Sequence, residues 1–394
     1  MNLPVNSCFL DLPEQYLFSE VAARVERYRL AHPAAQILRL GIGDVTRPLA
    51  PAVIAALHQA TEEQADADTF RGYAPECGYD FLRNAIAASY AAYGVTVSAE
   101  EVFVSDGAKS DLGNLTELFA RVPVQVQDPV YPVYADVNRL CGRTVYSLPA
   151  TAENAFLPLP DDSLPTPALI YLCSPNNPTG AVYDRKRLQI WVDYAGRTGS
   201  LLIFDAAYAA FLTGDFPHSI FEIPHARTCA LEVNSFSKSA GFTGLRCGYT
   251  VIPAELTVQG MPLSRLWKRR QATRYNGVPY VVQRAAEAAL SKDGMAQCRA
   301  DLAYYRQNAQ AIAAVLKQYG LSYTGGVCAP YLWFRCPHDM PSWDFFDLLL
   351  EKLQIVGTPG AGFGRAGEGY FRLSAFASAK SVAEAAERVR LYFG

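Results

Sequence analysis

Short apolar runs alternate with helical patterns through the middle of the chain, and this alternation constrains the fold more than any other sequence feature. Apolar runs of strand length are typical of strands buried on both faces, as in a parallel sheet covered by helices. The alternation therefore predicts an α/β architecture. The runs expected to form strands are Val102–Ser105, Val124–Gln127, Ala168–Cys173, Leu201–Phe204, Ala230–Asn234 and Cys247–Ile252.

From about Gln283 the pattern changes, and long amphipathic stretches dominate over strands such as Tyr331–Arg335 and Tyr370–Ser374. This change predicts a large α/β domain over residues 48–280 and a smaller α+β domain over residues 281–394. Residues 1–47 are expected to form an arm and a helix that join the smaller domain. The predicted helices are Tyr16–His32, Phe81–Tyr93, Leu188–Arg197, Gln283–Leu290, Leu302–Tyr319, Trp343–Leu353 and Val382–Tyr392.

Composition excludes several classes of protein. The 394 residues are 50 % hydrophobic and 19 % charged, which argues against disorder, and a net charge of −3 argues against a nucleic-acid-binding surface over the whole chain. The nine cysteines show no C-x-x-C spacing, so neither a metal site nor a disulfide framework is expected. Residues 1–14 lack the basic start of a signal peptide, and the longest uncharged run, Ser163–Tyr183, contains four prolines. These features predict a cytoplasmic protein that does not enter membranes.

Ser105-Asp106-Gly107-Ala108-Lys109 comes directly after one predicted strand and opens a helical pattern. A strand–turn–helix of this kind offers backbone N–H groups and the positive end of a helix dipole to an anion. The segment is a candidate phosphate site, although an ordinary turn with an exposed lysine has the same appearance.

Two further polar segments follow predicted strands. Pro175–Gly180 contains Asn176 and Asn177 and is by itself typical of a rigid turn, although its amides could also face a ligand. Asp205 closes the strand at 201–204, with Tyr208 three residues later. A carboxylate in that position needs a partner such as a protonated heterocyclic nitrogen, unless it caps a helix.

The segment Ser235–Arg246 places a single lysine, Lys238, among hydroxyl and glycine residues. Two hydroxyls and the guanidinium of Arg246 can hold a phosphate, because arginine binds phosphate in bidentate fashion. A lysine among uncharged neighbours can have the lowered pKa that a nucleophilic amine needs. An exposed loop lysine is an equally good interpretation of this segment alone.

Taken together and in this order, the four segments supply the parts of a pyridoxal phosphate pocket, and the chain resembles the fold-type I, class I/II aminotransferases over essentially its whole length. The resemblance implies a large domain with a mainly parallel sheet sandwiched by helices and a smaller α+β domain. It also implies pyridoxal 5'-phosphate as the cofactor and a homodimer whose active sites are shared between subunits.

Carried over residue by residue, the resemblance implies three catalytic residues. Lys238 would hold the cofactor covalently and move the proton, Asp205 would keep the pyridine nitrogen protonated, and Tyr131 would stack on the ring. The other expected cofactor contacts are Ala108, Lys109, Asn177, Tyr208, Ser235, Phe236, Ser237, Arg246 and Asn276, with Tyr73 of the partner subunit. The expected substrate contacts are Tyr16, Gly43, Glu76, Lys109, Tyr131, Asn177, Asn276 and Arg372, of which Arg372 would pair with the α-carboxylate.

Several stretches are similar to one branch of this family, the LL-diaminopimelate aminotransferases of lysine biosynthesis. The similarity implies LL-diaminopimelate, glutamate and 2-oxoglutarate as substrates. Glu76 of the neighbouring subunit is then expected to accept the distal ammonium of LL-diaminopimelate, with a solvated loop carboxylate as the alternative. The stretches are Tyr16–Glu20, Leu40–Pro48, Phe70–Tyr73, Asp128–Tyr134, Tyr275–Val278, Gly357–Gly364 and Gly369–Ser374.

Two departures adjoin the expected substrate pocket. The branch's usual Gly-Pro-Glu-Gln-Gly is here Ala74-Pro75-Glu76-Cys77-Gly78. Two alternative functions also stay open. One is an aspartate-, aromatic- or lysine-type aminotransferase, and the other is a non-catalytic binding protein on the same fold. The presence of both Lys238 and Asp205 weighs against the second.

Overall fold

A seven-stranded sheet forms the centre of the computed structural model, which describes residues 3–10, 12 and 16–393. Its strand order is β2-β8-β7-β6-β5-β3-β4, and β8 runs antiparallel to both of its neighbours while the other adjacent pairs are parallel. The α/β prediction is confirmed, and only β4 lies outside the predicted strands. The bounds are β2 (Val102–Ser105), β3 (Val124–Asp128), β4 (Val145–Pro149), β5 (Leu169–Cys173), β6 (Leu201–Asp205), β7 (Ala230–Ser235) and β8 (Gly248–Val251).

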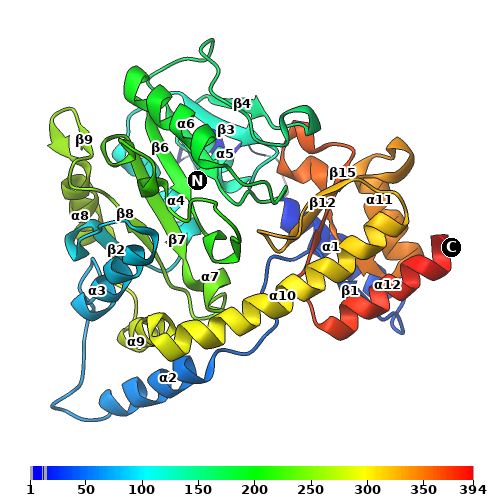
Figure 1. Ribbon diagram of the computed structural model, residues 1–394, viewed down its shortest axis with the longest axis horizontal. Coiled ribbons are helices and arrows are strands. Elements are labelled where there is room, and N and C mark those ends of the chain that lie inside the picture. The colour runs from blue at the N-terminus through cyan, green and yellow to red at the C-terminus, as the bar shows by residue number, and fades with distance from the viewer. Residues whose placement is uncertain (1–2, 11, 13–15, 394) are drawn as a thin grey trace.

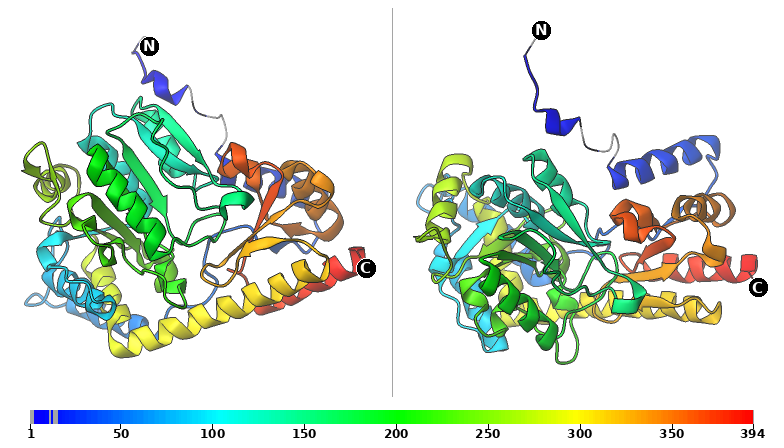
Figure 2. Two further views of the ribbon diagram at one scale, coloured as in Figure 1. Left: turned by 45° about the horizontal axis from the view of Figure 1, so that its top comes forward. Right: turned by 90° about the horizontal axis from the view of Figure 1, so that it is seen from above.

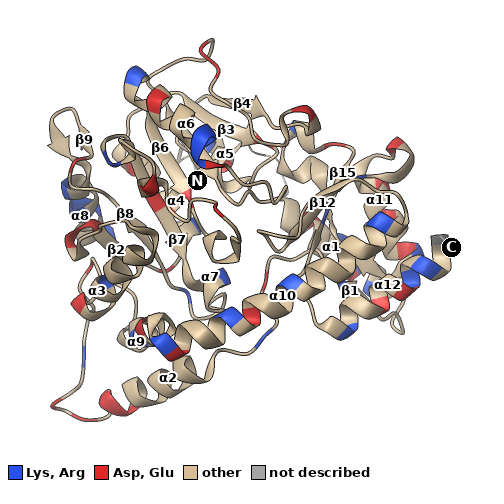
Figure 3. Ribbon diagram, in the orientation of Figure 1, with Lys and Arg blue, Asp and Glu red and all other residues tan. Residues whose placement is uncertain are grey.

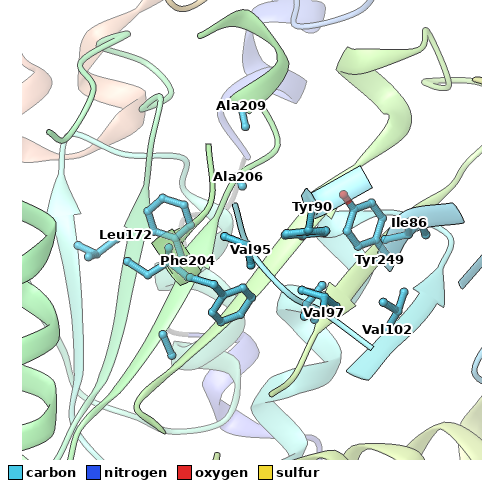
Figure 4. Close-up of a cluster of buried hydrophobic side chains, with 14 of the residues drawn as sticks. Ile86, Tyr90, Val95, Val97, Val102, Leu172, Phe204, Ala206, Ala209 and Tyr249 are labelled. Carbon is cyan, nitrogen blue, oxygen red and sulfur yellow. The ribbon is translucent and has the colours of Figure 1, made fainter. Parts of the chain in front are cut away.

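Helices cover both faces of this sheet (Figure 1), which explains why its strands read as continuous apolar runs. Every residue of β5 and β6 is buried. On one face Leu172 and Phe204 point into a cluster with Tyr90, Val97 and Tyr249 (Figure 4). Strand residues that point to the other face of the sheet pack into a second cluster with residues of helices α4 (Ala108–Leu115) and α8 (Leu263–Arg274).

The helices follow the predicted pattern in most places. The predicted helix at 302–319 begins earlier, at Lys292, where Oγ of Ser291 caps it by accepting a hydrogen bond of 3.1 Å from Gly294 N. The helices α2, α5, α7 and α8 were not predicted. The bounds are α1 (Leu17–Ala31), α2 (Pro51–Glu63), α3 (Asp80–Ser89), α4 (Ala108–Leu115), α5 (Val133–Leu140), α6 (Arg185–Thr198), α7 (Phe236–Ser239), α8 (Leu263–Arg274), α9 (Tyr280–Leu290), α10 (Lys292–Gln318), α11 (Ser342–Leu348) and α12 (Ala379–Phe393).

A second, four-stranded antiparallel sheet lies beside the first and has its own hydrophobic core. The long helix α10 runs past both sheets (Figure 1). The domain boundaries at residues 47 and 280 stay predictions. The strands of this sheet, in spatial order, are β11 (Tyr323–Gly325), β12 (Tyr331–Arg335), β15 (Tyr370–Ser374) and β14 (Thr358–Pro359), and the remaining short strands are β1 (Leu38–Arg39), β9 (Thr257–Val258), β10 (Met261–Pro262) and β13 (Ile355–Val356).

The surface combines charged helices with an exposed apolar N-terminal segment. Charged residues lie mainly on outer helices such as α8, α10 and α12 (Figure 3). The segment 3–10 projects from the body (Figure 2) and exposes Leu3, Val5, Phe9 and Leu10. In the part of the chain that the structure describes, no helix has both the length and the apolar character needed to cross a membrane.

Candidate active site

A cavity of about 380 Å³ opens where the carboxyl ends of the parallel strands face the second sheet. Strand order brings residues from distant segments to this edge: Asp205 ends β6, Lys238 lies on α7 directly after β7, and Arg372 comes from β15. Most of the predicted site residues line this cavity: Gly43, Ala108, Lys109, Tyr131, Asn177, Asp205, Tyr208, Ser235, Ser237, Lys238, Arg246 and Arg372.

Lys238 is an amine held in a desolvated position. Its Nζ donates a hydrogen bond to the backbone oxygen of Gly43. Burial is the main cause that lowers the pKa of Lys238 to about 8; Asp44 opposes the shift, and the nearby cations Arg246 and Arg372 contribute to it. An appreciable fraction of the amine is therefore neutral near pH 7, as a nucleophilic lysine requires.

Asp205 is a buried carboxylate without a cationic partner among the described residues. Its Oδ2 accepts a hydrogen bond of 2.6 Å from the Tyr134 hydroxyl, and its Oδ1 accepts one of 2.9 Å from Ala207 N. Burial raises the pKa of Asp205, and both hydrogen bonds counteract the increase. The alternative role as a helix cap is wrong, because the next short helix, Ala209–Phe211, has Tyr208 at its N-cap.

Arg372 is a buried cation that also has no carboxylate partner among the residues that the structure describes. Its Nη1 donates to Oδ1 of Asn177 at 2.6 Å, and its Nη2 donates to Gly41 O at 2.5 Å and to Oγ1 of Thr358 at 3.3 Å. Its Nε is buried and has no hydrogen-bond partner among the residues described. Burial lowers the pKa of Arg372. A carboxylate entering the cavity would supply the missing charge.

A cationic cradle lies where α4 begins. Gly107 has φ +138°, and a Cβ at this position would lie 2.5 Å from Nη2 of Arg246. Nη1 of Arg246 donates to Oγ of Ser237 at 3.3 Å, and Oγ of Ser235 accepts from Ser237 N at 3.1 Å. Together with the positive end of the α4 dipole, this guanidinium and these hydroxyls suit a phosphate group.

Aromatic side chains line the rest of the cavity. The hydroxyls of Tyr208 and Tyr331 are 2.7 Å apart, and the ring of Tyr131 packs edge-on against Tyr134, with 5.9 Å between centroids. Burial raises the pKa of Tyr131. Tyr16, a predicted substrate contact, does not line the cavity, but its ring centroid lies 5.2 Å from Nζ of Lys109, which does.

Sequence reasoning missed three of the aromatic residues that line the cavity: Phe18, Tyr134 and Tyr331. Tyr134 lies in the stretch 128–134, which resembles the aminotransferase family. Its position one helical turn after Tyr131 is the sequence feature that could have indicated a place in the site. Tyr331 is the first residue of a predicted strand, where core packing would explain an aromatic side chain equally well. No sequence pattern therefore indicated that Tyr331 lines the cavity.

Phe236, another predicted cofactor contact, has its side chain in the core. Its ring packs against Phe242 and Tyr249, with centroid distances of 5.7 and 5.8 Å, and it does not line the cavity. Its backbone N–H donates to Cys247 O. The Phe236 side chain therefore belongs to the apolar cluster on one face of the sheet, and its role as a cofactor contact stays a prediction.

Three further predicted residues, Tyr73, Glu76 and Asn276, lie outside this cavity. The Tyr73 side chain is 87 % exposed, and Asn276 is also exposed. The loops that carry these residues adjoin each other, since a Cβ on Gly277 would lie 2.7 Å from Cβ of Ala74. The three residues therefore belong to neighbouring loops on one surface of the chain.

Comparisons with known proteins agree on one family. The family model for aminotransferase class I and II matches residues 35–389. An LL-diaminopimelate aminotransferase of Agathobacter rectalis is 52 % identical over 402 aligned residues, covering 98 % of this chain and 99 % of that protein. One from Bacteroides fragilis is 49 % identical over 407 residues, covering 98 % of each. The solved L,L-diaminopimelate aminotransferase from Chlamydomonas reinhardtii superposes with a TM-score of 0.94, at 38 % identity and with full coverage of both chains.

Proposed function

The chain belongs to the aminotransferase class I and II family, and on that basis we propose that it interconverts LL-2,6-diaminopimelate and 2-oxoglutarate with tetrahydrodipicolinate and glutamate. The observation that carries the proposal is the convergence of Lys238, Asp205 and Arg372 on one cavity. Relatives that are about half identical over nearly their full length and carry the name of this activity identify the branch. The protein is thus a transaminase of diaminopimelate and lysine biosynthesis.

Pyridoxal 5'-phosphate is the proposed cofactor, and the residues fit its three functional groups. The cradle of Arg246, Ser235 and Ser237 suits the phosphate, and the unpaired Asp205 suits a protonated ring nitrogen. The amine of Lys238 suits the aldehyde carbon. Once bound, the cofactor supplies an electron-withdrawing ring that stabilises negative charge at the α-carbon of the substrate.

The chain's own groups then bind the amino acid and move its proton. Arg372 would pair with the α-carboxylate. Asn177 accepts from Arg372 through its Oδ1, so its amide NH2 group can donate to the phenolic oxygen of the cofactor, together with the Tyr208 hydroxyl. Lys238, as a neutral amine, would accept the proton from the α-carbon and pass it to the cofactor carbon that carried the aldehyde.

A second copy of the chain is proposed to complete each active site. Tyr73, Glu76 and Asn276 lie on adjoining loops outside the cavity of their own chain. A twofold-symmetric dimer would let these loops reach the partner's cavity, because such an interface repeats the same surface on both subunits. The exposed apolar residues Leu3 and Phe9 of the N-terminal segment supply further surface to bury.

Amino-donor specificity tests this function. Purified protein loaded with pyridoxal phosphate is mixed with 2-oxoglutarate and one donor at a time, and glutamate is measured. We expect glutamate with LL-diaminopimelate and far slower formation with aspartate, phenylalanine or lysine. Equal rates with aspartate would reject the proposed substrate, and no glutamate with any donor would favour a non-catalytic binding protein.

A further inference from the structure

We propose that Tyr305 is a positioning residue for Lys238, acting through the backbone of residues 41–47. This segment, called the strap here, lies along the cavity and contacts both of its key cations. Gly41 O accepts from Nη2 of Arg372, and Gly43 O accepts from Nζ of Lys238. The strap therefore connects the proposed carboxylate-binding residue to the proposed catalytic amine.

The backbone at the far end of the strap is held by the Tyr305 hydroxyl, while the Arg47 side chain pairs with Asp301 at 3.0 Å. Tyr305, which is 2 % exposed on α10, accepts hydrogen bonds of 2.7 Å from both Thr46 N and Arg47 N. Tyr305 does not line the cofactor cavity. Tyr305 can therefore affect catalysis only through the residues that it contacts, and so its role is to position them.

A second contact leads from Tyr305 to the same amine. Its ring packs edge-on against Phe376 with 4.8 Å between centroids, and Nζ of Lys238 lies 5.4 Å from the centroid of the Phe376 ring. Tyr305 thus supports Lys238 from two directions, through the strap carbonyl and through an aromatic wall. A phenylalanine at position 305 keeps the packing against Phe376 and removes only the hydroxyl that binds the strap. This substitution therefore separates the effects of the two contacts.

Loss of the hydroxyl leaves two backbone N–H groups without their acceptor, and burying such groups unpaired is unfavourable. We expect the strap to move outward until water reaches these groups. Gly43 O then moves away from Lys238, and the amine becomes more hydrated. Because burial is the main cause of its lowered pKa, the pKa of Lys238 should rise from about 8.

The test compares Tyr305→Phe with Tyr304→Phe. Tyr304 is the adjacent residue on α10, its hydroxyl accepts from Ala379 N at 2.6 Å, and its ring lies 4.9 Å from the Arg47 guanidinium carbon. The control therefore removes the same atom from a residue whose hydroxyl does not hold the strap. The pH dependence of Lys238 acetylation is measured in the apoenzyme by peptide mass spectrometry, and kcat and KM for LL-diaminopimelate are measured in the holoenzyme.

We expect Tyr305→Phe to shift the Lys238 acetylation profile to higher pH and to lower kcat roughly ten- to hundredfold, with a smaller change in KM. Tyr304→Phe should change neither. An unaltered Lys238 acetylation profile in Tyr305→Phe would overturn the proposal. A fall in thermal stability alone would not rescue it, because a residue with a purely structural role would lower stability without changing the profile.

The inference rests on the proposed function for its catalytic consequence, and the two can fail separately. Borohydride reduction of the wild-type holoenzyme and peptide mapping identify the lysine that binds the cofactor. Labelling of another lysine would reject the role assigned to Lys238. The acetylation profile reports on Tyr305 without cofactor, so an unchanged profile would reject the positioning role alone.

Discussion

The hydroxyl of Tyr134 donates a hydrogen bond of 2.6 Å to Oδ2 of Asp205, and both side chains are buried. The bond favours the charged carboxylate, whereas burial raises the pKa of Asp205. A neutral donor from α5 thus helps to keep Asp205 ionised without neutralising it. The carboxylate remains available to a cation that enters the cavity.

Asp205→Asn should leave a folded protein with transamination reduced by roughly a hundredfold or more, because a neutral amide cannot balance a protonated ring nitrogen. Tyr134→Phe should cause a smaller loss, since it removes one donor and keeps the charge. Steady-state kcat/KM, with thermal unfolding as the control for folding, measures both. Near-normal activity of Asp205→Asn would contradict the role given to this carboxylate.

Arg372→Lys should not behave as a conservative change. A guanidinium binds a carboxylate through two parallel N–H groups, which an ammonium cannot reproduce. We expect kcat/KM to fall by similar factors for LL-diaminopimelate and for glutamate, because both carry the same α-carboxylate. A loss confined to one donor would move Arg372 to the distal end of the pocket.

Lys238→Ala should abolish turnover while leaving phosphate binding by Arg246 and Ser235 intact. Equilibrium dialysis with pyridoxal phosphate measures the retained affinity, and rapid mixing with LL-diaminopimelate measures the lost chemistry. Restoration of slow turnover by added small primary amines would support Lys238 as the proton carrier. Normal turnover in Lys238→Ala would reject that assignment.

The sequence predicted the strands better than the helices, for a physical reason. Strands β5 and β6 are buried on both faces, so their apolar runs are unambiguous. The helix α8 contains five Lys and Arg residues among twelve, and this polar composition conceals its narrow buried stripe at Leu263, Trp267 and Gln271.

The candidate site was predictable where motif residues lie next to strand ends, as Asp205 and Lys238 do. Tyr331 and Tyr305 were not predictable, because hydroxyl contacts between distant segments of the chain leave no pattern in the local sequence. The resemblance also placed Phe236 among the cofactor contacts, and its side chain faces the core. The homodimer, the shared site and the cytoplasmic location stay predictions.

The stability of the protein should depend on pH through Glu232. This fully buried carboxyl accepts hydrogen bonds from Tyr90 and Ser219, and burial raises its pKa from 4.5 to about 7. The folded state therefore holds this proton more tightly than the unfolded state. The free energy of unfolding should fall as pH rises from about 4.5 to 7 and should then level off, with this group contributing roughly 3 kcal/mol.

Glu232→Gln should flatten that dependence, while Glu351→Gln, at an exposed position, should not. Denaturant unfolding at several pH values measures the difference. The slope that remains in Glu232→Gln is assigned to Asp111, a second buried carboxyl whose pKa burial raises to about 7. An unchanged slope would contradict the role of Glu232.

Glu76 should determine the preference for LL-diaminopimelate. This substrate carries an ammonium and a carboxylate at its non-reacting end, whereas glutamate carries only a carboxylate there. Glu76 lies three residues after Tyr73, on the surface proposed to reach the partner's cavity. Removing one partner of a desolvated charge pair typically costs roughly 2–5 kcal/mol. Glu76→Gln should therefore slow the half-reaction with LL-diaminopimelate by orders of magnitude and leave that with glutamate nearly unaffected, as single-turnover measurements would show.

Mixed dimers test whether Glu76 acts across the subunit interface. If each site takes Lys238 from one chain and Glu76 from the other, a hybrid of Lys238→Ala and Glu76→Gln subunits contains one site with both residues intact. Random reassembly of equal amounts should then recover about a quarter of the wild-type rate with LL-diaminopimelate, although each variant alone is nearly inactive. If Glu76 served its own chain, every intact Lys238 in the mixture would lie beside a glutamine, and mixing would recover nothing.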